Sequence, residues 1–144
     1  MAIIGLTLGS TKDYQSIYDS EKGSADATVF VLGTLDSRIM GKIRDLATTV
    51  TFNSPTRMSD EAQTTINSNE VAFNTVLYGL RGWKNFKDAK GNDIPFTTLE
   101  RRHSGALYNI ADPEIIKTLP TEIIQELAEQ IRSANEVKEV DAKN

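Results

Sequence analysis

Residues 27–33, Ala-Thr-Val-Phe-Val-Leu-Gly, together with the residues after them, decide the fold class that we expect. The run Ala27–Leu32 is β-branched and aromatic, and it is short and bounded by Asp26 and Gly33, which is typical of a buried strand. Thr34 then stands where a helix N-cap belongs. Apolar residues follow at helical spacing, namely Ile39, Ile43, Leu46 and Val50. The stretch therefore predicts a strand that leads into an amphipathic helix.

Helical spacing returns twice along the chain. Asn67 and Glu70 stand as in a capping box, and they precede the periodic set Val71, Ala72, Phe73, Val76, Leu77 and Leu80. Asp112 and Pro113 form a helix start for a short helix to Thr118. Beyond Pro120, the segment Thr121–Ala134 carries an apolar stripe of Ile123, Ile124, Leu127, Ala128 and Ile131. These patterns predict two longer helices and a short one.

Strand signals are weaker and more scattered. Thr48–Phe52 is β-branched, and residues 53–62 after it are expected to be a mobile loop. Trp83–Lys87 and Ile94–Thr98 are interpreted as the arms of a hairpin around a Gly91-Asn92 turn, and Ala106–Ile110 as a further strand. Tyr14–Ala25 is interpreted as a surface loop, with Tyr14, Ile17 and Tyr18 spaced like a single helical turn.

Strands and helices that do not alternate regularly favour an α+β fold. We expect a small mixed or antiparallel sheet, built from the segments at Ala27, Thr48, Ile94 and Ala106, to pack against about three helices. A mainly α domain with one β-hairpin is the alternative. A chain of 144 residues has room for one core, so we expect a globular domain at 1–132 and a flexible charged tail at 133–144.

Composition excludes several classes of function. The formal charge of −4 argues against a general affinity for nucleic acid. The chain has no cysteine, which removes disulfides, thiol catalysis and cysteine-ligated zinc. No segment reaches the roughly 20 apolar residues of a membrane span, and the apolar start lacks a basic leader. We therefore expect a protein of the cytoplasm, with no nucleic-acid or membrane partner.

Groups that carry chemistry are sparse. The only histidine, His103, lies between Arg102 and Ser104, and neighbours in an extended segment point to opposite faces. Asp88, Asn92 and Asp93 resemble part of a calcium loop, but Lys90 stands where a ligand is needed. The scattered glycines form no phosphate-binding loop. We expect no catalytic residue, cofactor or metal site, and a function other than enzymatic.

The segment Gly79-Leu-Arg-Gly-Trp-Lys-Asn-Phe86 is the candidate binding surface. Glycines at a helix end indicate either fraying toward a C-cap or close approach by another backbone. Trp83 is either a core residue or a partly exposed anchor, and one ring can be both. The predicted protein-interaction residues are Gly79, Arg81, Gly82, Trp83 and Phe86.

Basic residues outnumber acidic ones around this segment. The cations are Arg81, Lys84, Lys87, Lys90, Arg101 and Arg102, against Asp88, Asp93 and Glu100. Interleaved with aromatic residues, such cations can bind nucleic acid. The net negative charge of the chain argues against nucleic-acid binding. Two interpretations of this basic segment remain, a solvated face and a protein-contact surface. The second is favoured by the common use of Trp and Arg as interface anchors.

Three segments resemble small proteins encoded among the tail genes of tailed bacteriophages, described as tail assembly chaperones or tail-associated proteins. These are Thr28–Ser37, then Gly79–Phe86 with Asp88–Phe96, and Leu119–Ala128 ahead of a charged tail, together about half of the chain. The middle segment carries most of the resemblance.

The resemblance implies a protein that is not an enzyme and that binds the tape-measure protein or the tail-tube subunits while the tail is built. It also implies that a longer form can arise by ribosomal frameshifting near the end of the chain. One alternative is a virion component, such as a connector or minor tail subunit, and self-association stays open. The other is a cytoplasmic enzyme or regulator. The expected location is the host cytoplasm or the virion.

Overall fold

The computed structural model describes residues 2–52, 62–66 and 68–135, with the backbone alone for 48–52 and 62–66. Three sequence expectations therefore lie outside the described residues. They are the mobile loop up to residue 61, the role of Asn67 in a capping box, and the tail from residue 136 onward.

A three-stranded antiparallel sheet forms one layer of the molecule. Its order is β1 (Thr11–Tyr14), β2 (Val29–Gly33) and β5 (Leu80–Lys84). The central strand β2 buries Phe30 and Leu32 on one face, each only 2% exposed. The predicted buried strand at Ala27–Leu32 is thus confirmed, although it begins at Val29, and it lies at the centre of the sheet.

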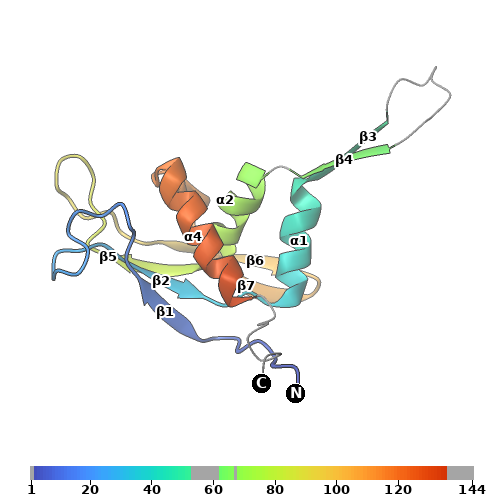
Figure 1. Ribbon diagram of the computed structural model, residues 1–144, viewed down its shortest axis with the longest axis horizontal. Helices are drawn as coiled ribbons and strands as arrows, with labels where there is room; N and C mark the ends of the chain where they lie inside the picture. Colours follow the sequence, from blue (N-terminus) through green and yellow to red (C-terminus); the bar gives the residue numbers. More distant parts are fainter. Residues whose placement is uncertain (1, 53–61, 67, 136–144) are drawn as a thin grey trace.

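Three helices stand side by side above the level of this sheet, and two of them pack on its strands (Figure 1). They are α1 (Ser37–Ala47), α2 (Ser68–Gly79) and α4 (Thr121–Ala134), and α2 lies between the other two. The short helix α3 (Pro113–Ile116) begins at Asp112, whose side chain accepts a hydrogen bond from the Glu114 amide. The predicted ranges of α3 and α4 are close to those observed.

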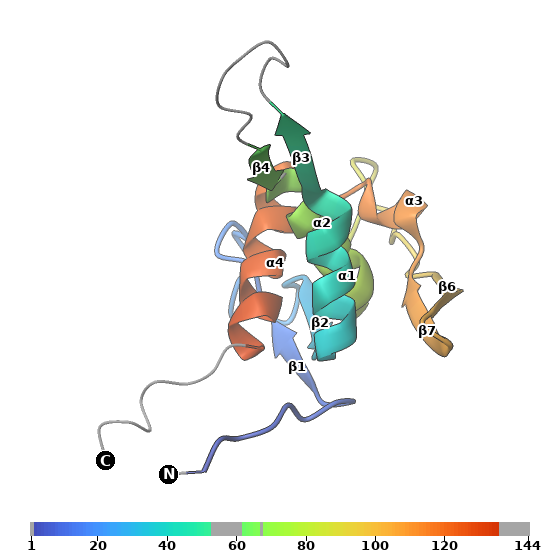
Figure 2. The ribbon, with the colours of Figure 1, turned by 90° about the vertical axis from the view of Figure 1, so that its right-hand side faces the viewer.

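Two hairpins complete the fold. The strands β6 (Thr98–His103) and β7 (Ala106–Ala111) pair with each other, and β7 brings Ile110 into the core. The strands β3 (Thr48–Phe52) and β4 (Ala62–Ile66) form a ribbon that projects away from the helices (Figures 1 and 2).

The α+β class is confirmed, with a small antiparallel sheet packed against three main helices, but the segments predicted to form that sheet are wrong. The segments at Ala27, Thr48 and Ala106 lie in three separate antiparallel sheets, and Ile94 lies in none of the named strands. The main sheet instead contains β1, whose last residue Tyr14 was assigned to a surface loop, and β5, whose first residue Leu80 was assigned to a helix. Polar β1 gives no period-two signal, because it is an edge strand that is exposed along most of its length.

The start of α1 also differs from the prediction. Asp36, not Thr34, caps this helix, since its carboxylate accepts a hydrogen bond from the Ile39 amide at 2.8 Å. The same carboxylate accepts from the Tyr108 hydroxyl at 2.7 Å, so it ties β7 to the helix start. Leu46 is 61% exposed and Ala47 is buried in its place.

Gly79 marks a close approach between two helices. A Cβ atom at Gly79 would lie 2.8 Å from both Cδ1 and Cγ2 of Ile131, which is completely buried on α4. The close approach expected at this glycine exists, but a side chain makes it and not a backbone. Gly82 is different, because a Cβ there would meet Val31 at 3.9 Å, an ordinary contact.

The chain remains ordered past the predicted start of the tail at residue 133. Ser133 and Ala134 belong to α4, and Asn135 caps its end. The Asn135 side chain accepts from the Leu35 amide and donates to the Leu35 carbonyl, which fixes the helix end to the segment after β2.

We predict that Gly79→Ala destabilises the protein and that Gly82→Ala does not. The first change overpacks a buried site, at a cost of about 1–3 kcal/mol that outweighs the better helix propensity of alanine. The second adds a methyl group where space exists. Urea unfolding of both variants and the wild type measures the difference, and equal stability of the two variants would contradict the packing described here.

Candidate protein-interaction surface

Four aromatic rings gather at the end of the main sheet. Phe30 is buried, while Trp83, Phe86 and Phe96 are partly exposed and pack against the core. Trp83 lies at the centre, with ring centroids 4.8 Å from Phe86, 5.0 Å from Phe96 and 6.5 Å from Phe30. Trp83 is therefore half-buried and packs against the core, while the remainder of the residue is accessible to solvent.

Hydrogen bonds hold the segment 83–96, which we call the aromatic loop. The Trp83 indole Nε1 donates to the Ile94 carbonyl at 2.6 Å, and the Ile94 amide donates to the Phe86 carbonyl at 2.8 Å. An isolated antiparallel bridge joins Lys87 and Asp93. The predicted hairpin is confirmed at this tip alone, because Trp83 and Lys84 belong to β5.

The tip of the aromatic loop is a hydrogen-bonded turn. Asp88 Oδ1 accepts from the amides of Lys90 and Asn92 at 2.9 and 3.0 Å, and Gly91 has a positive φ of 84°. Lys87 and Asp93 form an exposed ion pair at 3.2 Å. The carboxylate of Asp88 therefore accepts hydrogen bonds from the backbone of the turn, as aspartate side chains commonly do in turns.

The loop is also fixed to the start of β2. Asn85 has a positive φ of 58°, and its side chain donates to the Ala27 carbonyl at 3.1 Å. Thr28 Oγ1 donates to the Asn85 carbonyl at 2.8 Å. Because these bonds join residues far apart in sequence, the partly exposed rings sit on a rigid support.

The predicted interaction residues differ in burial: Gly79 is buried, Gly82, Trp83 and Phe86 are half-buried, and Arg81 is exposed. Gly79 is buried against α4 and does not reach the surface. Arg81 is the extra residue of a bulge between β2 and β5, and its side chain lies over Gly33 and donates to the Asn109 carbonyl at 3.4 Å. Partial burial lowers the pKa of Arg81. Gly82, Trp83 and Phe86 remain near the surface.

The basic residues do not form one patch. Lys84, Lys87 and Lys90 belong to β5 and the aromatic loop, at one end of the molecule. Arg101 and Arg102 lie near the β6–β7 turn, which is at the other end, beside α1 (Figure 1). Arg38 of α1 donates to the Ser104 carbonyl there at 3.5 Å. The charge excess seen in the sequence is thus spread over two distant sites.

His103 and Ser104 lie at this β6–β7 turn. Ser104 Oγ is 3.5 Å from His103 Nε2, which is a long hydrogen bond, and Ser104 has a positive φ of 50°. Ser104 is exposed. Within the ranges that the structure describes, no group of three His, Asp or Glu side chains is placed to hold a metal ion.

A groove beside α4 was missed at the sequence level. It has a volume of about 530 Å³ and is lined by Tyr14, Ile17, Tyr18, Thr121, Glu122, Gln125, Glu126, Glu129 and Gln130. Ile17 and Tyr18 are 66% and 62% exposed. Their apolar spacing was visible in the sequence, but it was assigned to a helical turn and not to the wall of a groove.

Glu126 holds the floor of this groove together. Its carboxylate accepts from the Tyr14 hydroxyl at 2.6 Å, the Ser16 hydroxyl at 2.6 Å and the Ile17 amide at 2.8 Å. Burial and the neighbouring carboxylate raise the pKa of Tyr14 to about 12. These three bonds, which we call the Glu126 latch, fix the chain after β1 to α4.

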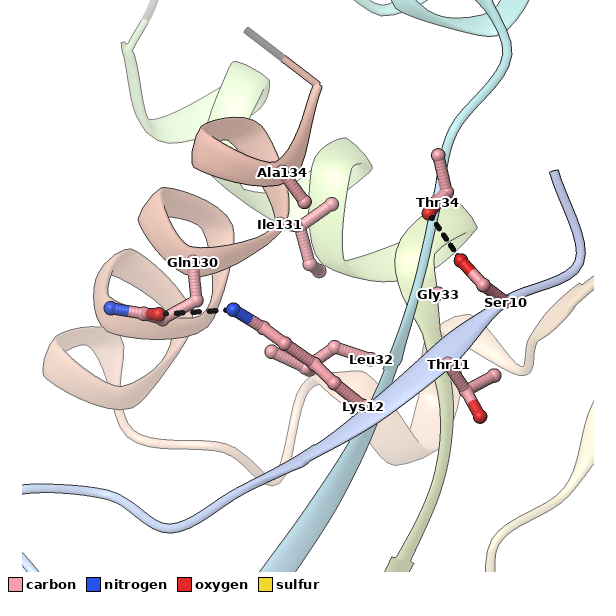
Figure 3. A pocket seen from close by; sticks show the side chains of 9 residues that line it. All are labelled: Ser10, Thr11, Lys12, Leu32, Gly33, Thr34, Gln130, Ile131 and Ala134. Carbon is pink, nitrogen blue, oxygen red and sulfur yellow. Dashed lines mark hydrogen bonds between the residues drawn. The ribbon is translucent and has the colours of Figure 1, made fainter. Parts of the chain in front are cut away.

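A smaller pocket of about 100 Å³ lies between the main sheet and the end of α4 (Figure 3). Lys12 reaches across it to Gln130, with Nζ and Oε1 3.5 Å apart. Ser10 and Thr34 join their hydroxyls at 3.2 Å at its edge. Its polar groups bind one another, and none of the three predicted surface residues Gly82, Trp83 and Phe86 lines it.

Searches with models of protein families, with curated protein sequences and with solved structures find no match to this chain. Within the parts of the chain that the structure describes, none of the helices combines the length and hydrophobicity that a membrane span needs.

We predict that the Glu126 latch makes stability fall at alkaline pH. The neutral Tyr14 phenol is the form that donates. Because its pKa of about 12 exceeds the ordinary value of 10.0, the contribution is complete below pH 10.0 and is lost as the pH rises toward 12.

Tyr14→Phe removes the titrating group but keeps the ring. Denaturant unfolding from neutral pH to pH ~11 should show that the wild type is more stable than this variant at neutral pH. The difference should shrink as the pH rises. Tyr108 titrates in both proteins and cancels in the comparison. A difference that stays constant with pH would contradict the latch.

Proposed function

We propose that this chain is a phage tail morphogenesis protein without enzymatic activity. It binds tape-measure protein or tail-tube subunits during assembly, and the surface that binds consists of Gly82 of β5 with Trp83, Phe86 and Phe96 of the aromatic loop. The proposal joins the resemblance of the segments around Gly79–Phe96 to the geometry of that loop.

The rigid, partly exposed ring group is the observation that carries the proposal. Partners bind most strongly to large aromatic side chains that are already fixed, because little rotamer entropy is lost on binding. Trp83 is fixed by the bond from its indole to the Ile94 carbonyl, and the loop by Asn85 and Thr28. The proposed binding surface is therefore preorganised in the free protein.

The loop matches what an assembly partner exposes. A tape-measure helix shows apolar stripes until the tube encloses it, and an apolar surface of modest size covers such a stripe reversibly. Lys90, exposed at the tip of the aromatic loop, suits an acidic neighbour, and such peripheral charges mainly change the rate of association. Arg81 contributes indirectly, since it joins β5 to β7.

A virion component that stays in the particle is the second candidate within the phage context. Mass spectrometry of purified particles separates the two, because a chaperone is absent from finished particles and a connector is present in fixed stoichiometry. A tape-measure gene beside the gene for this chain would support both phage hypotheses over the hypothesis of a cytoplasmic enzyme or regulator.

We predict that Phe86→Ala weakens binding to tape-measure or tail-tube protein by about tenfold or more, the range of an interface anchor. Trp83→Phe serves as a second variant, because it keeps a ring and loses the bond to Ile94. Leu107→Ala is the matched control, since Leu107 is an apolar residue, 55% exposed, on the distant β6–β7 hairpin.

Isothermal titration of the purified proteins measures affinity, and circular dichroism verifies folding. Full co-purification of a folded Phe86→Ala protein with both candidate partners would count against the aromatic loop. If the wild-type chain itself binds neither partner, the phage assignment fails and the surface needs another partner.

A further inference from the structure

An apolar segment at the start of the chain has no cover in the described structure. Residues 2–8, Ala-Ile-Ile-Gly-Leu-Thr-Leu, precede β1 outside any helix or strand and carry no charged side chain. Ile3, Ile4 and Leu8 are 87%, 74% and 59% exposed. Ile4, Leu6 and Leu8 alternate as the apolar side of a strand does. We call residues 2–8 the arm.

The arm joins β1 through a turn that suits a hinge. The Ser10 amide and hydroxyl both bind the Thr7 carbonyl, at 3.4 and 2.9 Å, and Gly9 has a positive φ of 87°. No Cβ at Gly9 would meet another atom within 4 Å, so packing does not fix the direction of the arm.

β1 itself offers a place for another strand. It is an edge of the main sheet, and among the described strands only β2 pairs with it. Thr11, Lys12 and Asp13 are exposed. An edge strand with unpaired backbone groups is a template for pairing with another chain.

The arm and the groove beside α4 lie at opposite ends of β1. The arm precedes Thr11, whereas the groove begins at Tyr14 and continues with Ile17 and Tyr18. In Figure 1 the arm runs away from the end of β1 at which the groove lies. The arm can therefore reach the groove of the same chain only if it turns back and runs along the whole length of β1.

A second copy of the chain removes this difficulty. When two β1 strands pair antiparallel, edge to edge, the residues before Thr11 of one copy lie beside the residues after Tyr14 of the other. The arm of each copy then meets the groove of its partner, and the arrangement has the self-complementary form of a twofold interface. The two three-stranded sheets become one continuous sheet.

We propose that this chain forms a symmetric dimer through its β1 edges, in which each arm occupies the groove between Tyr14–Tyr18 and α4 of the other copy. The arm supplies uncharged apolar side chains, and the groove supplies Ile17, Tyr18 and the backbone that the Glu126 latch holds in place. This dimer leaves the aromatic loop free, so it is independent of the proposed partner in the phage tail.

The first test is the mass of the full chain by light scattering during size exclusion, over a range of concentrations. We expect a dimer, and we expect Leu8→Asp to shift it to monomer, because a charge on the arm must be desolvated in the groove. Leu107→Asp is the control, at 55% exposure against 59% for Leu8, and should leave the dimer intact. A monomeric wild type, or a dimer that Leu8→Asp does not weaken, overturns the proposal.

The second test uses the absence of cysteine from the chain. A tagged Leu8→Cys chain mixed with an untagged Tyr18→Cys chain should give a mixed cross-linked dimer with a short bis-maleimide, because the two thiols meet only between copies. Leu107→Cys in place of Leu8→Cys should give none. In a double Leu8→Cys, Tyr18→Cys protein at high dilution, cross-linking within one chain would show that the arm folds back, and would overturn the proposal.

Discussion

The packing of α4 against α2 is the constraint on which the rest of the structure depends. Ile131 of α4 occupies the space that a side chain at Gly79 would fill, so the helices approach closely at the point where α2 ends. One residue later β5 begins, and Leu80 is buried. This contact therefore fixes the place where α2 ends and β5 begins, and with it the start of the aromatic loop that continues β5.

Both candidate surfaces are attached to that scaffold, at different places. The aromatic loop continues β5 and is held to β2 through Asn85, so its rings are positioned by the sheet. The groove is positioned by α4, because Glu126 binds the chain that follows β1. A change in the helix packing should therefore disturb both surfaces, whereas substitutions at exposed positions of one should leave the other intact.

Local signals explain how much of this could be predicted from the sequence. The strand at β2, the Asp112 cap and the stripe of α4 each depend on neighbouring residues, and they were predicted. The pairing of the strands depends on contacts between residues distant in sequence, so the composition of the sheets was not predicted. The aromatic loop was found because Trp83 and Phe86 stand together, but the inward position of Gly79 and the latch at Glu126 required the fold. No periodicity brings Tyr14 and Glu126 together.

Hydrogen exchange of the full chain, with and without tape-measure or tail-tube protein, tests most directly that a rigid core presents the aromatic loop as a binding surface. In the free protein, the amides of α2, α4, β2 and β5 should exchange most slowly, because they surround the buried contact of Gly79 with Ile131. Addition of the partner should slow exchange within residues 83–96 above all. Rapid exchange in α2 and β5, or partner protection confined to the β6–β7 hairpin, would contradict the account.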